Sequence, residues 1–185
     1  MNAVGLISQY FGSLMSHWRT TDDGWQYDVF PRGIEPAKTG AFESLVRVWQ
    51  SKNTSNGLPS WRDFDLMDFE GWWGWLVVYD VISLDPLDLR CRLWGSGLVT
   101  YHGLDATDRR LRDPKSGMLG DSTMFDDTDV EFFSYLIEGA SIGVCVGSMN
   151  WQKREYLGYQ ALRLPLADDG VRVDKLLCAS IIKEI

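Results

Sequence analysis

Alternating apolar and polar positions in the second half of the chain predict antiparallel strands. Residues 75–82 are β-branched and aromatic, which is typical of a strand. Residues 89–93 alternate strictly, so two arginines lie on one face and Leu89, Cys91 and Leu93 lie on the other. We expect these two segments to pair through a short loop. Three more strands are predicted over 143–151, 156–166 and 171–182, with a hairpin turn at Asp168-Asp169-Gly170 before the last.

Apolar residues at three- and four-residue steps predict helices elsewhere in the chain. Residues 42–53 show this spacing, and so do residues 128–140, where Thr128-Asp-Val-Glu131 fits a capping box. A similar stripe over 3–18 predicts an N-terminal helix. Its polar face carries almost no charge, so we expect it to dock on its own domain or on a second copy, as in a homodimer. Glycines and prolines in residues 20–38 predict an irregular connector.

This order of elements predicts an α+β fold. The chain has 185 residues, of which 45% are hydrophobic, enough for one folded domain with a short addition. We therefore divide it into a helix and connector over residues 1–38 and a domain over residues 39–185.

Charge and cysteine content exclude several classes of partner. The net charge of −8 argues against nucleic acid, because no general positive field attracts phosphates. No apolar stretch approaches the ~18 residues of a membrane helix. Three widely spaced cysteines form neither a disulfide framework nor a zinc motif. We expect a cytoplasmic protein with reduced thiols and no metal site.

Three short motifs resemble those of a bacterial branch of the PAS family. Trp49 and the run Leu58-Pro59-Ser60-Trp61-Arg62-Asp63-Phe64-Asp65 resemble its opening tryptophan and LP-x-R-x-D-x-D signature. Arg92-Leu93-Trp94-Gly95-Ser96 is similar to its R-L-x-G-T, and Gly103-Leu104-Asp105-Ala106-Thr107-Asp108 to its G-x-D-L-T-G, although Asp108 replaces the last glycine. The resemblance implies a five-stranded antiparallel sheet with helices on one face that enclose a pocket. It also implies sensing or protein interaction, with no defined reaction.

No motif identifies a cofactor or a catalytic group, so the cofactor stays unknown. The resemblance places a haem-binding histidine on the long helix, but residues 128–140 contain none. The three cysteines lie outside a flavin-photosensor motif, and Gly95-Ser-Gly97 lacks the third glycine of a dinucleotide loop. Two histidines without a nucleophile elbow give no triad.

We predict a sensory module that binds a small, largely apolar ligand or a signalling partner protein. The residues expected to line its pocket are Leu89, Cys91, Leu93, Tyr101, His102, Phe133 and Ile137. The first alternative is a ligandless interaction or dimerisation module. It would use Trp72, Trp73, Trp75 and two residues of the N-terminal helix, Tyr10 and Leu14. The second alternative is a small enzyme with Asp105, His102 or Tyr101 as acid and base.

Overall fold

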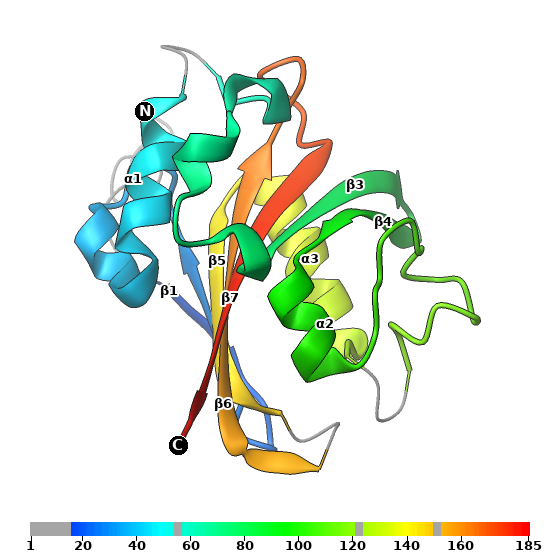
Figure 1. The fold of residues 1–185 in the computed structure, drawn as a ribbon. Helices are drawn as coiled ribbons and strands as arrows, with labels where there is room; N and C mark the ends of the chain where they lie inside the picture. The colour runs from blue at the N-terminus through cyan, green and yellow to red at the C-terminus, as the bar shows by residue number, and fades with distance from the viewer. Residues whose placement is uncertain (1–15, 54–56, 121–123, 150–152) are drawn as a thin grey trace, which may run out of the picture.

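Seven strands form one open antiparallel sheet in the described part of the chain. The computed structural model describes residues 16–53, 57–120, 124–149 and 153–185 (Figure 1). The strand order across the sheet is β1-β2-β5-β6-β7-β3-β4. The strands are β1 (Ser16–Thr20), β2 (Gln26–Phe30), β3 (Leu76–Leu84), β4 (Leu87–Trp94), β5 (Ile142–Met149), β6 (Arg154–Leu166) and β7 (Lys175–Glu184). The α-helices are α1 (Glu43–Ser51), α2 (Ser96–His102) and α3 (Asp127–Gly139). Short 3-10 helices span Pro36–Phe42, Trp61–Asp63, Leu66–Phe69 and Trp73–Trp75. The predicted α+β class is confirmed.

The strands and helices predicted after residue 40 are present, with shifted ends. β3 and β4 form the expected antiparallel pair, and β5, β6 and β7 form a meander. The last strand begins at Lys175, so the predicted start at residue 171 is wrong. The Asp169 carboxylate accepts the backbone N–H groups of Val171 and Arg172, both at 2.8 Å, and this turn takes the place of the start of the predicted strand.

The N-terminal prediction is wrong where the structure describes it. Residues 26–30 form β2, which pairs with β5, and the expected irregular connector is therefore partly sheet. Trp18 lies at a register shift of strand β1, so the predicted helix does not reach it. Tyr10 and Leu14 lie outside the described residues. The boundary predicted between residues 38 and 39 stays a prediction.

Helices lie on both sides of the sheet. Figure 1 shows α1 on one side of the central strands and α2 and α3 on the other, so the prediction of helices on one face is wrong. On the first side, Trp49 Nε1 donates to the Pro165 carbonyl at 3.0 Å. On the second, a β-carbon on Gly143 of β5 would overlap Leu136 and Phe132 of α3, so a glycine is needed for this close packing.

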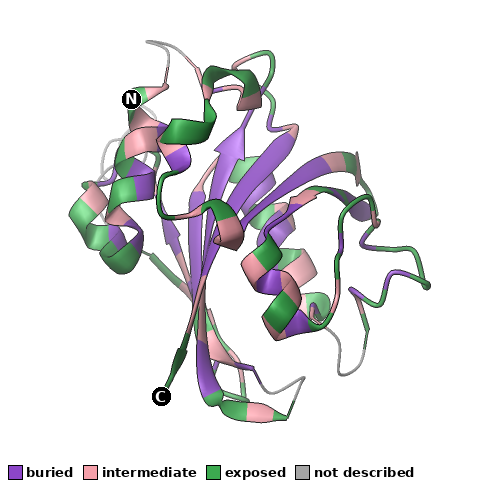
Figure 2. Ribbon diagram, in the orientation of Figure 1, coloured by how far each residue is buried: buried purple, intermediate pink, exposed green. Residues whose placement is uncertain are grey.

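The core follows the central strands. Figure 2 shows buried residues concentrated in β3, β5, β6 and β7, between the helices. A second apolar cluster lies between α3 and the N-terminal hairpin, and its buried members are Trp25, Tyr27, Val29, Phe132, Leu136, Cys145 and Ala161. The hairpin thus covers side chains of α3, β5 and β6 that would otherwise face water.

Candidate functional site

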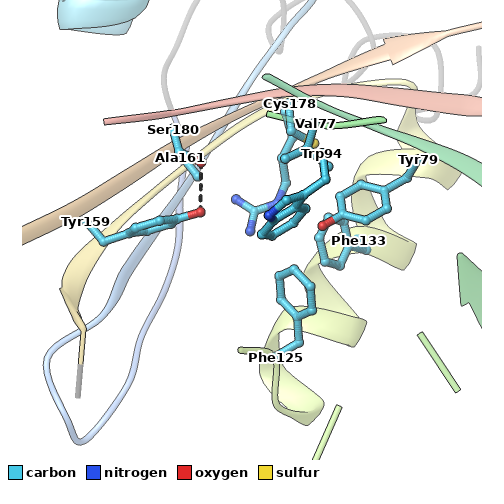
Figure 3. A pocket seen from close by; sticks show the side chains of 10 residues that line it. Val77, Tyr79, Trp94, Phe125, Phe133, Tyr159, Ala161, Cys178 and Ser180 are labelled. Carbon is cyan, nitrogen blue, oxygen red and sulfur yellow. Dashed lines mark hydrogen bonds between the residues drawn. The ribbon is translucent and has the colours of Figure 1, made fainter. Parts of the chain in front are cut away.

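A small cavity lies between the sheet and helix α3 (Figure 3). Its volume is about 20 Å³. This is close to the room that one water molecule needs. Strands β3, β4, β6 and β7, helix α3 and Phe125 supply its lining, which consists of Val77, Tyr79, Trp94, Phe125, Phe133, Tyr159, Ala161, Arg163, Cys178 and Ser180.

Aromatic side chains fill most of the space around this cavity. The rings of Tyr79, Phe125 and Phe133 contact one another edge to face, with centroids 5.4 to 6.3 Å apart. Such contacts favour a fixed arrangement of the three rings. The cavity is therefore small because its own side chains occupy the volume between sheet and helix.

Arg163 is the one charged residue of the lining, and it is 4% exposed. Its Nη1 donates to Cys145 Sγ at 2.9 Å, and its Nη2 lies 3.7 Å from Asp129 Oδ1. The guanidinium carbon lies 4.7 Å from the centre of the Phe133 ring. Its Nε is buried without a hydrogen-bond partner, as is Nε1 of Trp94. Both residues border the cavity, and each has one buried N–H group without a partner.

Asp129 connects Arg163 to the start of helix α3. Its backbone N–H donates to Asp126 Oδ1 at 3.0 Å, and Asp126 N–H donates to Asp129 Oδ2 at 3.3 Å, which forms a capping box. Tyr27 of β2 donates its hydroxyl to Asp129 Oδ1 at 3.3 Å. Burial raises the pKa of Asp129 to about 6, even though the charge of Arg163 lowers it. One carboxylate thus contacts the cavity arginine, the helix cap and the N-terminal hairpin.

Burial also keeps the neighbouring thiols and imidazole neutral. It raises the pKa of Cys178 to about 12 and that of Cys91 to about 12. Burial and, less strongly, the charge of Arg154 lower the pKa of His102 to about 4. Neutral thiols are weak nucleophiles. The charged groups of this region are therefore the side chains of Arg163 and Asp129. The described residues contain no group of three or more His, Cys, Asp or Glu side chains placed to hold a metal ion.

Of the seven side chains predicted to line the pocket, Phe133 does so. Leu89, Cys91 and Ile137 are buried in the core but do not border the cavity. Tyr101 packs against Trp75, with ring centroids 5.7 Å apart. His102 lies beside the cavity, packed edge to face on two of its lining residues, Trp94 and Tyr159.

A bulge in the β3–β4 pair explains why Leu93 does not border this cavity. Val77 pairs with Trp94 and Val78 with Leu93, but the register shifts before Tyr79, which pairs with Cys91. Strict alternation through residues 89–93 is therefore broken, and Trp94 takes the face of Val77 and Tyr79 that lines the cavity. Leu93 pairs instead beside Val78, on the opposite face.

The sequence contained one signal for the missed arginine. Arg163 stands among Leu162, Leu164 and Leu166 in a strand that otherwise reads as buried. A charge inside such a run marks either an exposed edge or a buried site. The cavity aromatics Tyr79 and Tyr159 carried no comparable signal, because aromatic residues are frequent in ordinary strands.

The residues of the two alternative predictions have separate surroundings. Trp73 is 48% exposed, and its Nε1 donates to the Leu66 carbonyl at 2.8 Å. Trp72 is half-buried and stacks on Phe42, and Trp75 is half-buried against Tyr101. Asp105 accepts the backbone N–H of Thr107 at 2.9 Å in a turn. The proposed acid–base residues are therefore engaged with different neighbours.

Comparisons with known proteins define no family for this chain. No family model, no curated protein and no solved structure matched it. Among the described residues, no helix combines the length and apolar character required to cross a membrane. The fold and the site together define an α+β protein with a buried arginine at a small aromatic cavity.

Proposed function

We propose that the chain is a non-enzymatic sensory or regulatory module of PAS-like type that binds a small, largely apolar ligand. The order of its elements supports this proposal. A hairpin of two strands, a helical segment and a meander of three strands follow one another from β3 to β7, as the resemblance of the three motifs implies. Strands β1 and β2 are additions at the β5 edge of the sheet.

The observation that carries the proposal is the contact chain from the cavity to two other elements. Arg163 borders the cavity and lies 3.7 Å from Asp129, which caps α3 and accepts from Tyr27 of β2. A ligand that touches Arg163 therefore affects the start of a helix and the N-terminal hairpin. Such a ligand shifts the protein between two states by the difference in its affinity for them.

Mass measurement under native and then denaturing conditions tests this function. We expect the freshly purified protein to release a non-covalent small molecule on denaturation. Ala161→Leu fills the cavity from β6 and should abolish this mass difference, because Ala161 borders the cavity. Ala167→Val is the matched control, since Ala167 is equally buried but lies outside the lining.

The outcomes distinguish a sensor from other classes. Retention of the small molecule in Ala161→Leu would place the binding site elsewhere. A bare protein that also binds no member of a broad set of small apolar compounds would exclude the sensor function. Circular dichroism and urea unfolding show whether each variant retains its fold.

A ligandless interaction module is the second candidate, because an apolar surface is exposed near the predicted tryptophans. Leu66 is 68% exposed and Met67 64% exposed, and Trp73 lies against Leu66. Exposed apolar residues in a group are typical of contact surfaces. Light scattering over a range of concentrations tests for a homodimer, which Met67→Glu should weaken if this surface forms it. A monomer at every concentration would exclude the homodimer.

A further inference from the structure

We propose that the cavity recognises the carboxylate of a small organic acid, with Arg163 as the recognition residue and Trp94 as a second donor. This inference rests on the proposed sensor function and specifies the class of ligand. Two buried N–H groups, Arg163 Nε and Trp94 Nε1, belong to lining residues and have no hydrogen-bond partner. A buried donor without a partner is costly, and a carboxylate accepts two such donors at once.

The surroundings of Arg163 leave its charge only partly compensated. Asp129 Oδ1 is 3.7 Å from Nη2, longer than a strong ionic hydrogen bond of about 2.7–2.9 Å. Nη1 donates to a thiol, which stays neutral because burial raises the pKa of Cys145. Burial of a cation in such a site is unfavourable unless anionic or polar groups surround it. An anion beside Nε would accept its hydrogen bond and balance the charge of the guanidinium.

The other walls of the cavity select an acid with an apolar body. Tyr79, Phe125 and Phe133 present aromatic edges and faces, and Ala161 is small. The present volume accepts about one water-sized group, so a carboxylate with its apolar body enters only if side chains of the lining move. Phe125 belongs to the lining and stands just before α3, so we expect the body of a benzoate-sized acid to displace its ring.

Binding of an acid should be coupled to protonation of Asp129. The groups that face this carboxylate are Arg163 from β6, Tyr27 from β2, Cys145 from β5 and Asp126 from the start of its own helix. A second anion at Arg163 raises the proton affinity of Asp129, because it shares the only cation among these groups. Affinity should therefore increase as the pH falls from about 7.5 toward 6, while a ligand carboxylate of ordinary pKa stays ionised.

Titration calorimetry of the full chain with benzoate and its neutral analogue benzamide tests the proposal. We expect benzoate to bind and benzamide to bind at least about tenfold more weakly. Arg163→Lys keeps a cation but removes the guanidinium N–H, and Trp94→Phe removes the indole N–H with little loss of ring. Each should weaken benzoate about tenfold while the weak binding of benzamide stays unchanged. Buffers of different ionisation enthalpy report the proton that binding takes up.

The controls separate this inference from the proposed function. Equal affinity for benzoate and benzamide, or unchanged benzoate binding in Trp94→Phe, would overturn the carboxylate site and leave the sensor function standing. Benzamide binding without benzoate binding would do the same. Failure of both probes overturns the carboxylate site for acids of this size. The sensor function is contradicted as well only if the purified chain also carries no small molecule and binds no apolar compound. Trp94→Phe keeps the test valid if Arg163→Lys does not fold.

Discussion

Two side chains near the cavity contribute to stability with opposite dependence on pH. The pKa of Asp129 is raised from 3.8 to about 6, so between these values the folded chain holds a proton that the unfolded chain has lost. Its contribution therefore falls as the pH rises from about 4 to 6. The pKa of His102 is lowered from 6.5 to about 4, so here the unfolded chain binds the extra proton. Its contribution rises over nearly the same interval.

The two effects should nearly cancel in the wild-type protein. Each pKa shift corresponds to about 3 kcal/mol between pH 4 and 7. We expect the stability of Asp129→Asn to rise with pH relative to wild type, and that of His102→Gln to fall relative to wild type. Urea unfolding at half-unit steps of pH measures both slopes. Asp127→Asn, exposed in the same helical turn, serves as the control, and parallel curves for all four proteins would contradict the assignment.

At the level of elements, the start of α3 shows how a cap can be misplaced by two residues. The sequence predicts a capping box from Thr128, but Asp126 and Asp129 form it. We expect Asp126→Ala to lower the free energy of unfolding by about 1 kcal/mol, because Asp129 loses the acceptor of its backbone N–H. Thr128→Ala should change it by less than about 0.5 kcal/mol. Urea unfolding measures both changes. Equal losses of unfolding free energy in the two variants would indicate that Thr128 contributes to the cap as much as Asp126 does.

Sequence periodicity predicts the elements that bury one continuous apolar face. The stripe of α3 and the alternation around Leu89 and Cys91 are of this kind, and both elements were found. Periodicity gives the wrong face where a bulge interrupts the alternation of a strand. At the bulge in β4, Trp94 lies on the cavity face of the sheet and Leu93 on the opposite face. Such a break depends on the partner strand, so one strand's own residues do not reveal it.

The candidate site depends even more strongly on contacts between residues that are far apart in the sequence. Arg163 of β6 lies close to Asp129, at the start of α3. It borders the cavity together with Trp94 of β4 and Cys178 of β7, which lie far from it along the chain. The sequence predicts a pocket between the sheet and the long helix, and of the predicted lining residues Phe133 borders the cavity. The electrostatic part of the site was missed because its members stand far apart along the chain.

At the scale of the molecule, the hairpin of β1 and β2 extends the sheet and covers one side of α3. Trp18 lies 5.1 Å from Phe132 between ring centroids, and Tyr27 lies 5.0 Å from the same ring. The sequence predicted a connector here because glycines and prolines flank a strand of five residues. Pairing with β5 and aromatic contacts with α3 outweigh that local signal.

Two truncations that differ only by this hairpin test whether residues 16–30 belong to the folding unit. A chain that begins at Ile34 should unfold at a lower urea concentration than one that begins at Ser16. The shorter chain exposes Phe132 and Leu136, and unpairs the edge of β5. It should also bind a dye specific for exposed apolar surface. Equal unfolding midpoints for the two chains would instead place the domain boundary after the hairpin, near the predicted residue 38. In that case Tyr27 would be unnecessary for the ionisation of Asp129. The shorter chain would then show the same dependence of stability on pH as the longer one, so the two measurements check each other.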